Sequence, residues 1–403
     1  MLRSHTRNRS SGGSDGSVFD FSQVSVPAGF TFSRASSKRY VGSNGYIQVA
    51  GNNVKPVCYD PTTLTLLGFN KEGSGTNICL QSETFTNATW TKTDITPTAA
   101  STLSPDNTTG GTLITEGSAG TAVLSQAITT VTNTLYTFSL WVKRGNTDWL
   151  RLFITDGTNT VNQWVNVSTG DLGTKSTSGT VSNTDATIEA FRDSWYRVSV
   201  TGQYSGTATN VSIHSASADA STTRVNGATY YVWGAQHEQN YLSTSYIPTT
   251  SGSATRAIET LSGPVSSLTR FNNTSGTALL YCTNAKTFSS SFHQRGIGFE
   301  GSAGYNMNLY RNYFYSGRWN FSGSDNFAGQ WDLLQAAAGT GGNANGALTR
   351  CVVSWEANNI AFSQDGQAPS TDNSATVPTV STLIIGGDTT DHHYGYIREI
   401  RIY

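Results

Sequence analysis

The sequence is poor in charged residues, which make up 13% of its 403 residues, about half the share in an ordinary soluble protein. Its 25 Lys and Arg nearly balance its 26 Asp and Glu, so no whole-chain field would attract nucleic acid or an anionic membrane. There is no run of about 18 apolar residues, and the N-terminus lacks the apolar core of a signal peptide. We therefore expect no membrane span, no nucleic-acid partner and synthesis in the cytoplasm without Sec export.

Cysteine is also scarce, and the four residues are widely spaced without a CxxC or Cys/His zinc pattern: Cys58, Cys79, Cys282 and Cys351. We expect free buried thiols, with a bridge from Cys282 to Cys351 as an unsupported alternative.

Recognisable catalytic patterns are missing as well. There is no Gly-x-Ser-x-Gly motif, no phosphate-binding glycine loop and no strand that pairs carboxylates two residues apart. These absences predict a protein that is not an enzyme. An active site assembled from distant loops is the less favoured alternative, because such sites leave no sequence trace.

Glycine is abundant, at 41 residues, and Ser, Thr, Asn and Gly separate short apolar runs that alternate with period two. This pattern predicts an all-β chain with two tandem antiparallel β-sandwiches, jelly-roll type first and concanavalin A-like second. The expected divisions are a flexible basic arm at 1–17 with Arg3, Arg7 and Arg9, a docking or cap segment at 18–80, a sandwich at 81–242, a linker at 243–256 and a sandwich at 257–403.

Four tryptophans fall on the polar sides of their expected strands, opposite the apolar positions. An indole beside Asn, Ser or Arg offers a sugar a flat apolar surface and hydrogen-bond donors. We predict a glycan-binding or partner surface formed by Trp141, Trp149, Arg151, Asn162, Trp164, Asn166 and Trp195. The alternative is that the N-terminal segment, the second domain or another subunit covers these tryptophans.

Two further segments carry weaker signals. In GGDTTDHHYGY, Asp388 and Asp391 are candidate calcium ligands, but a polar loop between the last two strands is favoured. In YRNYFYSGRW, the residues Tyr310, Tyr313, Tyr315 and Trp319 could line a groove, but packing within a hairpin is favoured.

The stretches FTFSRASSKRYVGSNGYIQVAGNNVKPVCYDP, TNICLQSETFTNATW, SWYRVSVTGQ and WGAQHEQNYLSTSYIPTTSGSATRA together resemble tail-fibre and head-fibre type virion proteins of bacteriophages that carry a carbohydrate-binding-module-like jelly roll. The second half, with NIAFSQDGQ, STLIIGG and GYIREIRIY, resembles laminin-G or concanavalin A-like sandwiches. Where the virion proteins often have Gln-Leu-Glu, this chain has Gln236, His237 and Glu238.

The resemblance implies a non-enzymatic virion structural protein, of fibre or decoration type, that binds glycans through aromatic surfaces. The implied partners are other virion proteins, host or environmental glycans and further copies of the chain, for example in a trimer. A decoration or connector protein that acts only through protein contacts is the second hypothesis, and a glycan depolymerase is the third. No cofactor is expected apart from the calcium alternative.

Overall fold

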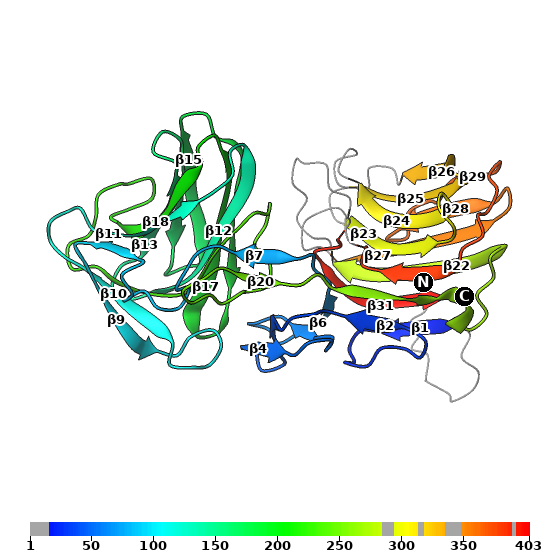
Figure 1. Cartoon of the computed structure of the whole chain (residues 1–403), viewed down its shortest axis with the longest axis horizontal. Coiled ribbons are helices and arrows are strands. Elements are labelled where there is room, and N and C mark those ends of the chain that lie inside the picture. Colours follow the sequence, from blue (N-terminus) through cyan, green and yellow to red (C-terminus); the bar gives the residue numbers. More distant parts are fainter. Residues whose placement is uncertain (1–15, 284–293, 313–317, 335–347, 389–391) are drawn as a thin grey trace, which may run out of the picture.

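The computed structural model of the protein describes residues 16–283, 294–312, 318–334, 348–388 and 392–403. These residues form antiparallel β-sheets packed in two lobes that lie side by side (Figure 1). The described helices are short 3-10 turns, η1 (Arg192–Ser194) and η2 (Val265–Ser267). In the described part of the chain, no helix is long and apolar enough to cross a membrane. The predicted all-β fold with two sandwiches is confirmed.

The first sandwich consists of two sheets that pack face to face. One sheet is called the Arg151 sheet, after a residue of its strand β13. In spatial order it contains β15 (Asp171–Ser178), β14 (Thr160–Asn166), β13 (Trp149–Thr155), β18 (Ala208–Ala216), β11 (Val123–Thr129) and β8 (Thr91–Thr93). The other sheet is called the clasp sheet, after the segment 239–250 that folds back over it. It contains β16 (Ser182–Ala190), β17 (Trp195–Tyr204), β12 (Thr134–Arg144), β19 (Thr229–Glu238), β10 (Gly111–Glu116) and β9 (Ile95–Thr102). Successive side chains of a strand point to opposite faces, so Leu150, Leu152 and Ile154 of β13 all enter the core.

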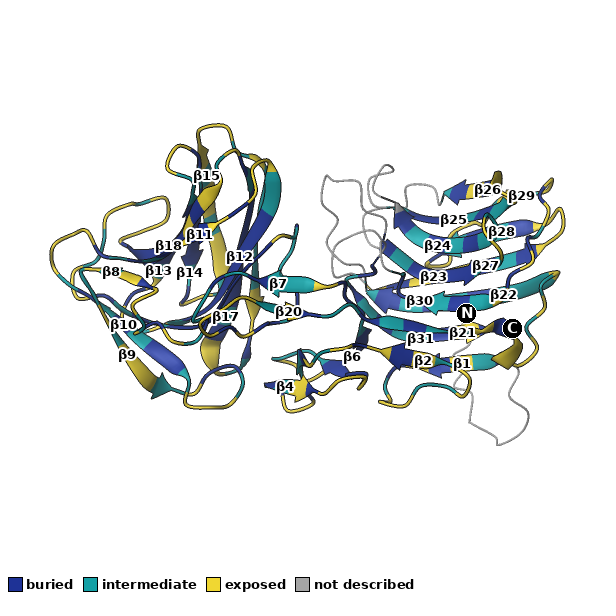
Figure 2. Ribbon diagram, in the orientation of Figure 1, coloured by how far each residue is buried: buried dark blue, intermediate teal, exposed yellow. Residues whose placement is uncertain are grey.

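The second sandwich is also built from two sheets. One contains β29 (Ser370–Asp372), β28 (Ile360–Gln364), β27 (Leu348–Glu356), β22 (Ser275–Thr283), β31 (Tyr396–Ile402), β6 (Leu66–Asn70) and β5 (Cys58–Tyr59), and β1 (Ser17–Asp20) also pairs with β31. The other contains β2 (Thr31–Ser33), β21 (Thr260–Pro264), β30 (Thr382–Ile385), β23 (Gln294–Glu300), β24 (Asn306–Asn312), β25 (Arg318–Asp325) and β26 (Ala328–Leu334). Buried residues are concentrated in the strands of both lobes, whereas many of the connecting loops are exposed (Figure 2).

The N-terminal segment at 18–80, predicted to be a docking or cap element, mostly joins the sheets of the second sandwich. Its strands β1, β2, β5 and β6 complete the two sheets of that sandwich. Phe19, Phe21, Phe32 and Phe69 are buried in the same core as the C-terminal strand β31. The segment is too short to form a core of its own, and these pairings with distant strands bury its apolar side chains.

One hairpin of that segment instead docks on the first sandwich. Strands β3 (Lys38–Val41) and β4 (Ile47–Ala50) pair around the turn formed by Ser43, Asn44 and Gly45. Gly45 adopts a φ of 79°, in the left-handed region that glycine accommodates. The backbone N–H of Ile47 donates to the carbonyl of Pro105 at 2.8 Å, which ties the hairpin to the first sandwich.

The first sandwich is an insertion within the second. The chain leaves the second sandwich through β7 (Gly75–Asn77) and returns through β20 (Ala254–Arg256), and these two strands pair with each other between the lobes (Figure 1). Strand β20 therefore gives regular structure to the end of the segment that was predicted to be a linker. The two ends of the described chain also meet, because Ser17 pairs with Ile402.

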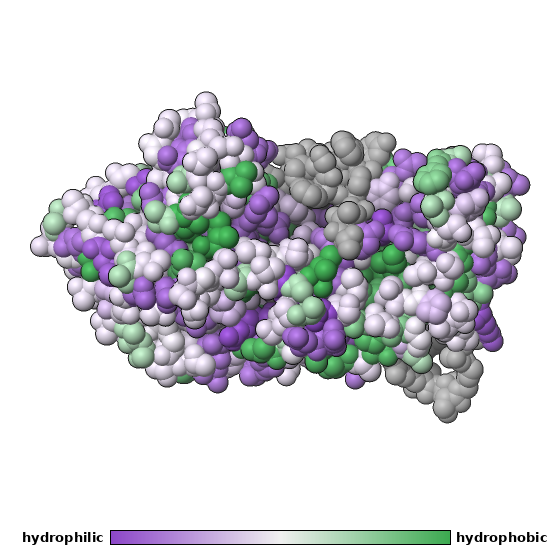
Figure 3. Space-filling view, viewed as in Figure 1, coloured by the Kyte–Doolittle hydropathy of each residue, from purple (hydrophilic) through white to green (hydrophobic). Residues whose placement is uncertain are grey.

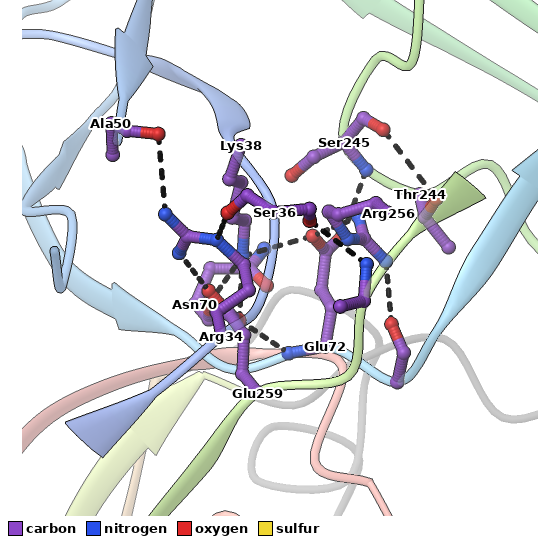
Figure 4. A network of polar contacts seen from close by, with 12 residues as sticks. Arg34, Ser36, Lys38, Ala50, Asn70, Glu72, Thr244, Ser245, Arg256 and Glu259 are labelled. Carbon is purple, nitrogen blue, oxygen red and sulfur yellow. Dashed lines mark hydrogen bonds and ion pairs between the residues drawn. The ribbon is translucent and has the colours of Figure 1, made fainter. Parts of the chain in front are cut away.

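A buried ionic network lies at the base of β7 and β20, the strands through which the chain leaves and re-enters the second sandwich. We call Arg34, Lys38, Glu72, Arg256 and Glu259 the crossover network (Figure 4). The carboxylate of Glu259 binds Arg34 and Lys38 at 2.8 Å each, and that of Glu72 binds Lys38 at 2.9 Å and Arg256 at 2.7 Å. The network thus joins the N-terminal segment to the exit and return strands.

The segment that follows β19, residues 239–250, folds back over the clasp sheet and is called the clasp. The Tyr246 ring packs 5.3 Å from Trp141 and 4.7 Å from Trp233 between ring centroids. Its hydroxyl donates to Glu83 at 3.0 Å. Tyr246 thus holds the clasp against the first sandwich. The expected free thiols are also confirmed, since all four cysteines are buried and unbridged.

Candidate functional sites

Five of the seven predicted surface residues lie together on the outer face of the Arg151 sheet. Trp149 is paired with Asn166 and Arg151 with Trp164, and Asn162 lies across from Phe153. On the other side of β13, Arg151 is paired with His214 of β18. Because these residues share one face of three adjacent strands, their side chains form one cluster. We call it the Arg151 face.

The guanidinium of Arg151 is held flat at the centre of this face. It donates to Asn162 Oδ1 from Nε at 3.1 Å and from Nη2 at 2.5 Å. Its central carbon lies 4.5 Å from the ring centroid of Phe153 and 5.3 Å from that of Trp164. No ion pair to Arg151 occurs among the described residues. The five N–H donors of a guanidinium are therefore not saturated by a carboxylate here.

His214 of the neighbouring strand β18 also holds the Arg151 guanidinium. Burial lowers the pKa of His214 to about 3, so the imidazole is neutral at physiological pH. Its Nδ1 donates to the carbonyl of Ser215 at 2.5 Å, which leaves Nε2 to accept from Arg151 Nη1 at 3.2 Å. Asn162 and His214 thus fix the guanidinium from two neighbouring strands.

The face is only partly open to solvent. Trp149, Arg151 and Phe153 are half-buried, whereas Trp164 is 3% exposed and donates from Nε1 to the carbonyl of Ser221 at 2.6 Å. Asn166 is half-buried and its Oδ1 accepts from Ser168, so it shapes the turn after β14. The predicted exposure is therefore wrong for Trp164, and the accessible part of the face is Trp149, Arg151 and Phe153.

The other two predicted residues, Trp141 and Trp195, lie on the outer face of the clasp sheet and are each 1% exposed. They belong to a buried cluster with Ile47 of the N-terminal hairpin, Phe191, Trp233 and Tyr246. The exposed-platform prediction is wrong for both, because the hairpin and the clasp cover them, as the alternative stated. Sequence periodicity identified the correct strand face, but it carries no information on what covers that face.

A cavity of about 600 Å³ lies beside this cluster, between the two lobes. Strand β17 contributes Arg197, Ser199 and Thr201. The remaining walls come from β16, the N-terminal segment, the clasp and the start of β31. Tyr40, Tyr394 and Tyr396 supply half-buried rings to the lining. Sequence analysis did not identify Arg197 as part of a site, since β17 reads only as an amphipathic strand. We call this space the junction cavity.

The calcium prediction has no support at Asp388. The Asp388 carboxylate lies 3.2 Å from Arg295 Nη1, and its backbone carbonyl accepts from Lys71 Nζ. A cationic neighbour at the carboxylate disfavours a second cation there. Within the described ranges, no group of three or more His, Cys, Asp and Glu side chains is arranged to hold a metal ion.

Several residues that were singled out in the sequence lie outside the described ranges or in the core. The calcium candidate Asp391, the arm residues Arg3, Arg7 and Arg9, and Tyr313 and Tyr315 lie outside the described residues. Trp319 is fully buried in the core of the second sandwich, in agreement with the favoured packing role.

The molecular surface in the view of Figure 3 is mostly hydrophilic or weakly polar, with apolar residues in small patches.

Several acidic side chains are engaged in structural contacts. Glu238 accepts from the backbone N–H of Thr244 at 2.7 Å and from its hydroxyl at 2.9 Å. Glu116 accepts from the backbone N–H and the hydroxyl of Ser215, each at 2.6 Å. Glu72 and Glu259 are neutralised in the crossover network. These four carboxylates hold the fold together.

No family model and no curated protein sequence matches the chain. Among solved structures, the mouse laminin alpha1 chain, domains LG4-5, is 10% identical over 69% of this chain and 86% of that chain, with a TM-score of 0.25. The tandem CBM22 domains of Paenibacillus barcinonensis Xyn10C are 10% identical over 82% and 98%, with a TM-score of 0.27. NanB with Optactamide is 14% identical over 35% of this chain and 24% of that chain, with a TM-score of 0.28. The chain thus spans about a quarter of NanB, and these values assign neither a family nor a function.

Proposed function

We propose that the protein is a non-enzymatic structural protein of a bacteriophage particle, of fibre or decoration type, which binds glycans at the Arg151 face. The observation that carries the binding proposal is the half-buried guanidinium of Arg151, fixed by Asn162 and His214 and flanked by aromatic rings. A saccharide places C–H groups against rings and hydroxyls against donors, and this face supplies both. Preorganised donors lose little entropy on binding.

The assignment to a virion is supported by the sequence resemblance described above. The non-enzymatic assignment is supported by the engagement of Glu72, Glu116, Glu238 and Glu259 in structural contacts. Other virion proteins and further copies of this chain are the proposed partners, and a trimer would multiply weak glycan contacts through avidity.

Glycan-array binding followed by titration calorimetry tests the proposal with Arg151→Met and Trp149→Ala. A hydrogen bond to a charged group contributes about 1.5–3 kcal/mol, so the loss of Arg151 should weaken binding roughly tenfold or more. Arg144→Met is the matched control, because Arg144 is half-exposed on the same sandwich and pairs with Asp148. Equal affinity of Arg151→Met and the unaltered chain for every bound glycan would rule out this face.

Two further measurements test the rest of the proposal. Mass spectrometry of purified particles of the encoding phage should detect the chain as a component, and its absence would contradict the virion assignment. Incubation with host polysaccharide should release no new reducing ends. Release of oligosaccharides would instead support the depolymerase hypothesis.

A further inference from the structure

The junction cavity is lined by a buried cation, Arg197, that has no direct ion pair in the described structure. Arg197 is 7% exposed, and its one hydrogen bond to the described residues runs from Nη2 to Ser139 Oγ at 3.0 Å. Its Nε is buried without a partner in the described structure. Its guanidinium carbon lies 4.4 Å from the ring centroid of Trp141. Burial of a charge is unfavourable unless hydrogen bonds and an opposite charge compensate it.

The neighbouring carboxylates Glu189, Glu238 and Glu72 attract the charge of Arg197 from a distance, but none of them forms a direct ion pair with it in the described structure. Glu189 is the cross-strand partner of Arg197 on β16, yet it is exposed and forms no ion pair with Arg197 in the described structure. Glu238 is committed to Thr244. Glu72 is committed to Lys38 and Arg256. The guanidinium therefore lines the cavity with donor groups that no carboxylate of the described structure contacts directly.

The remaining lining defines the rest of a ligand. The hydroxyl-bearing residues Ser199 and Thr201 of β17 and Ser243, Thr244 and Ser245 of the clasp line the space, together with the half-buried rings of Tyr40, Tyr394 and Tyr396. Asp185 and Glu189 add carboxylates to the lining. Rings, hydroxyls and carboxylate acceptors match a polyhydroxylated ring, while additional acidic groups disfavour a polyanion. The volume falls in the ordinary range of small-ligand sites, about 300–1,000 Å³.

We propose that the junction cavity is a second ligand site, separate from the Arg151 face, which binds a saccharide carrying a single carboxylate. The carboxylate accepts hydrogen bonds from the guanidinium of Arg197. The sugar hydroxyls contact the Ser and Thr hydroxyls and the carboxylates of Asp185 and Glu189. Its wall residues come from both lobes, so the ligand contacts the first sandwich and the start of β31 at once.

Titration calorimetry on the full chain tests this site with a matched pair of oligosaccharides, one ending in a hexuronate and the other in the corresponding neutral hexose. We expect the acidic ligand to bind at least tenfold more tightly than the neutral one. Arg197→Met should remove that preference, and Arg197→Lys should retain part of it because lysine keeps the charge without the planar fork. Equal binding of the two sugars, or an unchanged preference in Arg197→Met, would overturn the proposal.

A thermal unfolding measurement separates binding from folding. Replacing a buried cation that has no direct ion pair with an apolar side chain of similar size should leave the melting temperature unchanged or raise it. A marked decrease for Arg197→Met would make Arg197 a structural residue and contradict the site. Equally tight binding of a simple carboxylate peptide would contradict the saccharide class. Trp149→Ala and Arg151→Met should leave cavity binding intact, so that failure at one site is distinguished from failure at the other.

Discussion

Glu259→Gln is expected to destabilise the protein strongly, because it removes one of the two carboxylates of the crossover network. Glu259 binds Arg34 and Lys38, and all three side chains are fully buried. The network contains the cations Arg34, Lys38 and Arg256 and the anions Glu72 and Glu259, so its net charge rises from +1 to +2 on substitution. Glutamine keeps the shape of the side chain and isolates the effect of charge.

The remaining contacts set the size of the effect. Breaking a buried ion pair by removing one partner costs about 3–5 kcal/mol. Arg34 keeps hydrogen bonds to backbone carbonyls such as that of Gly51 at 2.7 Å, and Lys38 keeps Glu72 and the carbonyl of Asn70. These contacts place the cost near the lower limit, at about 3 kcal/mol. For a domain of this size that corresponds to a fall in melting temperature of roughly 6–12 °C.

Differential scanning calorimetry and urea unfolding measure this change. Asp148→Asn is the matched control, since it breaks an ion pair with Arg144 in which both side chains are about half exposed. Such pairs contribute about 0.2–1 kcal/mol. If Glu259→Gln were no more destabilising than Asp148→Asn, the crossover network would not hold the lobes as argued here.

Three further outcomes are expected. Burial alone would raise the pKa of Glu72, but Arg256 and then Lys38 outweigh burial and lower the pKa to about 2. The stabilisation by the Glu72 carboxylate is therefore present above pH 4.5 and is lost as the pH falls towards 2. The difference in unfolding free energy between Glu72→Gln and the unaltered chain, measured by urea unfolding, should shrink by about 3 kcal/mol across that window. Gly234→Ala should lower the melting temperature, because φ is 65° and a Cβ would lie 2.8 Å from Trp141, whereas Gly252→Ala, with open space around it, should not. Replacing residues 78–253 with a short Gly/Ser linker should leave a second sandwich that unfolds cooperatively, because Asn77 and Ala254 are paired neighbours; an unfolded product by circular dichroism would contradict the insertion.

The local structure could be predicted from the sequence where period-two alternation was strong. Leu150, Leu152 and Ile154 enter the core, and Trp149, Arg151 and Phe153 share the outer face, as the pattern indicated. The insertion could not be predicted in this way. Pairing of Ser17 with Ile402 joins opposite ends of the chain, and periodicity defines strands without naming their distant partners.

The two candidate sites differ in the same respect. The Arg151 face is built from neighbouring strands β13 and β14, so its members could be grouped from sequence. The junction cavity needs β17, the clasp, the N-terminal segment and β31 in one place, and only the tertiary structure brings them together. Arg197 had no distinguishing signal in the sequence, since its significance comes from burial beside the cavity without a direct ion pair in the described structure.

The insertion topology explains why the cavity can act as a connection between the lobes. The first sandwich is attached through the paired strands β7 and β20, and the crossover network fixes both strands at their base. The cavity lies between that attachment and the outer face of the clasp sheet, with walls from both lobes. A ligand that contacts both walls binds only when the lobes hold this arrangement, so its binding free energy stabilises the arrangement by mass action. Occupancy of the cavity should therefore raise the unfolding temperature of the full chain, but not that of the second sandwich after removal of residues 78–253. An equal rise in both proteins would mean that the ligand binds elsewhere.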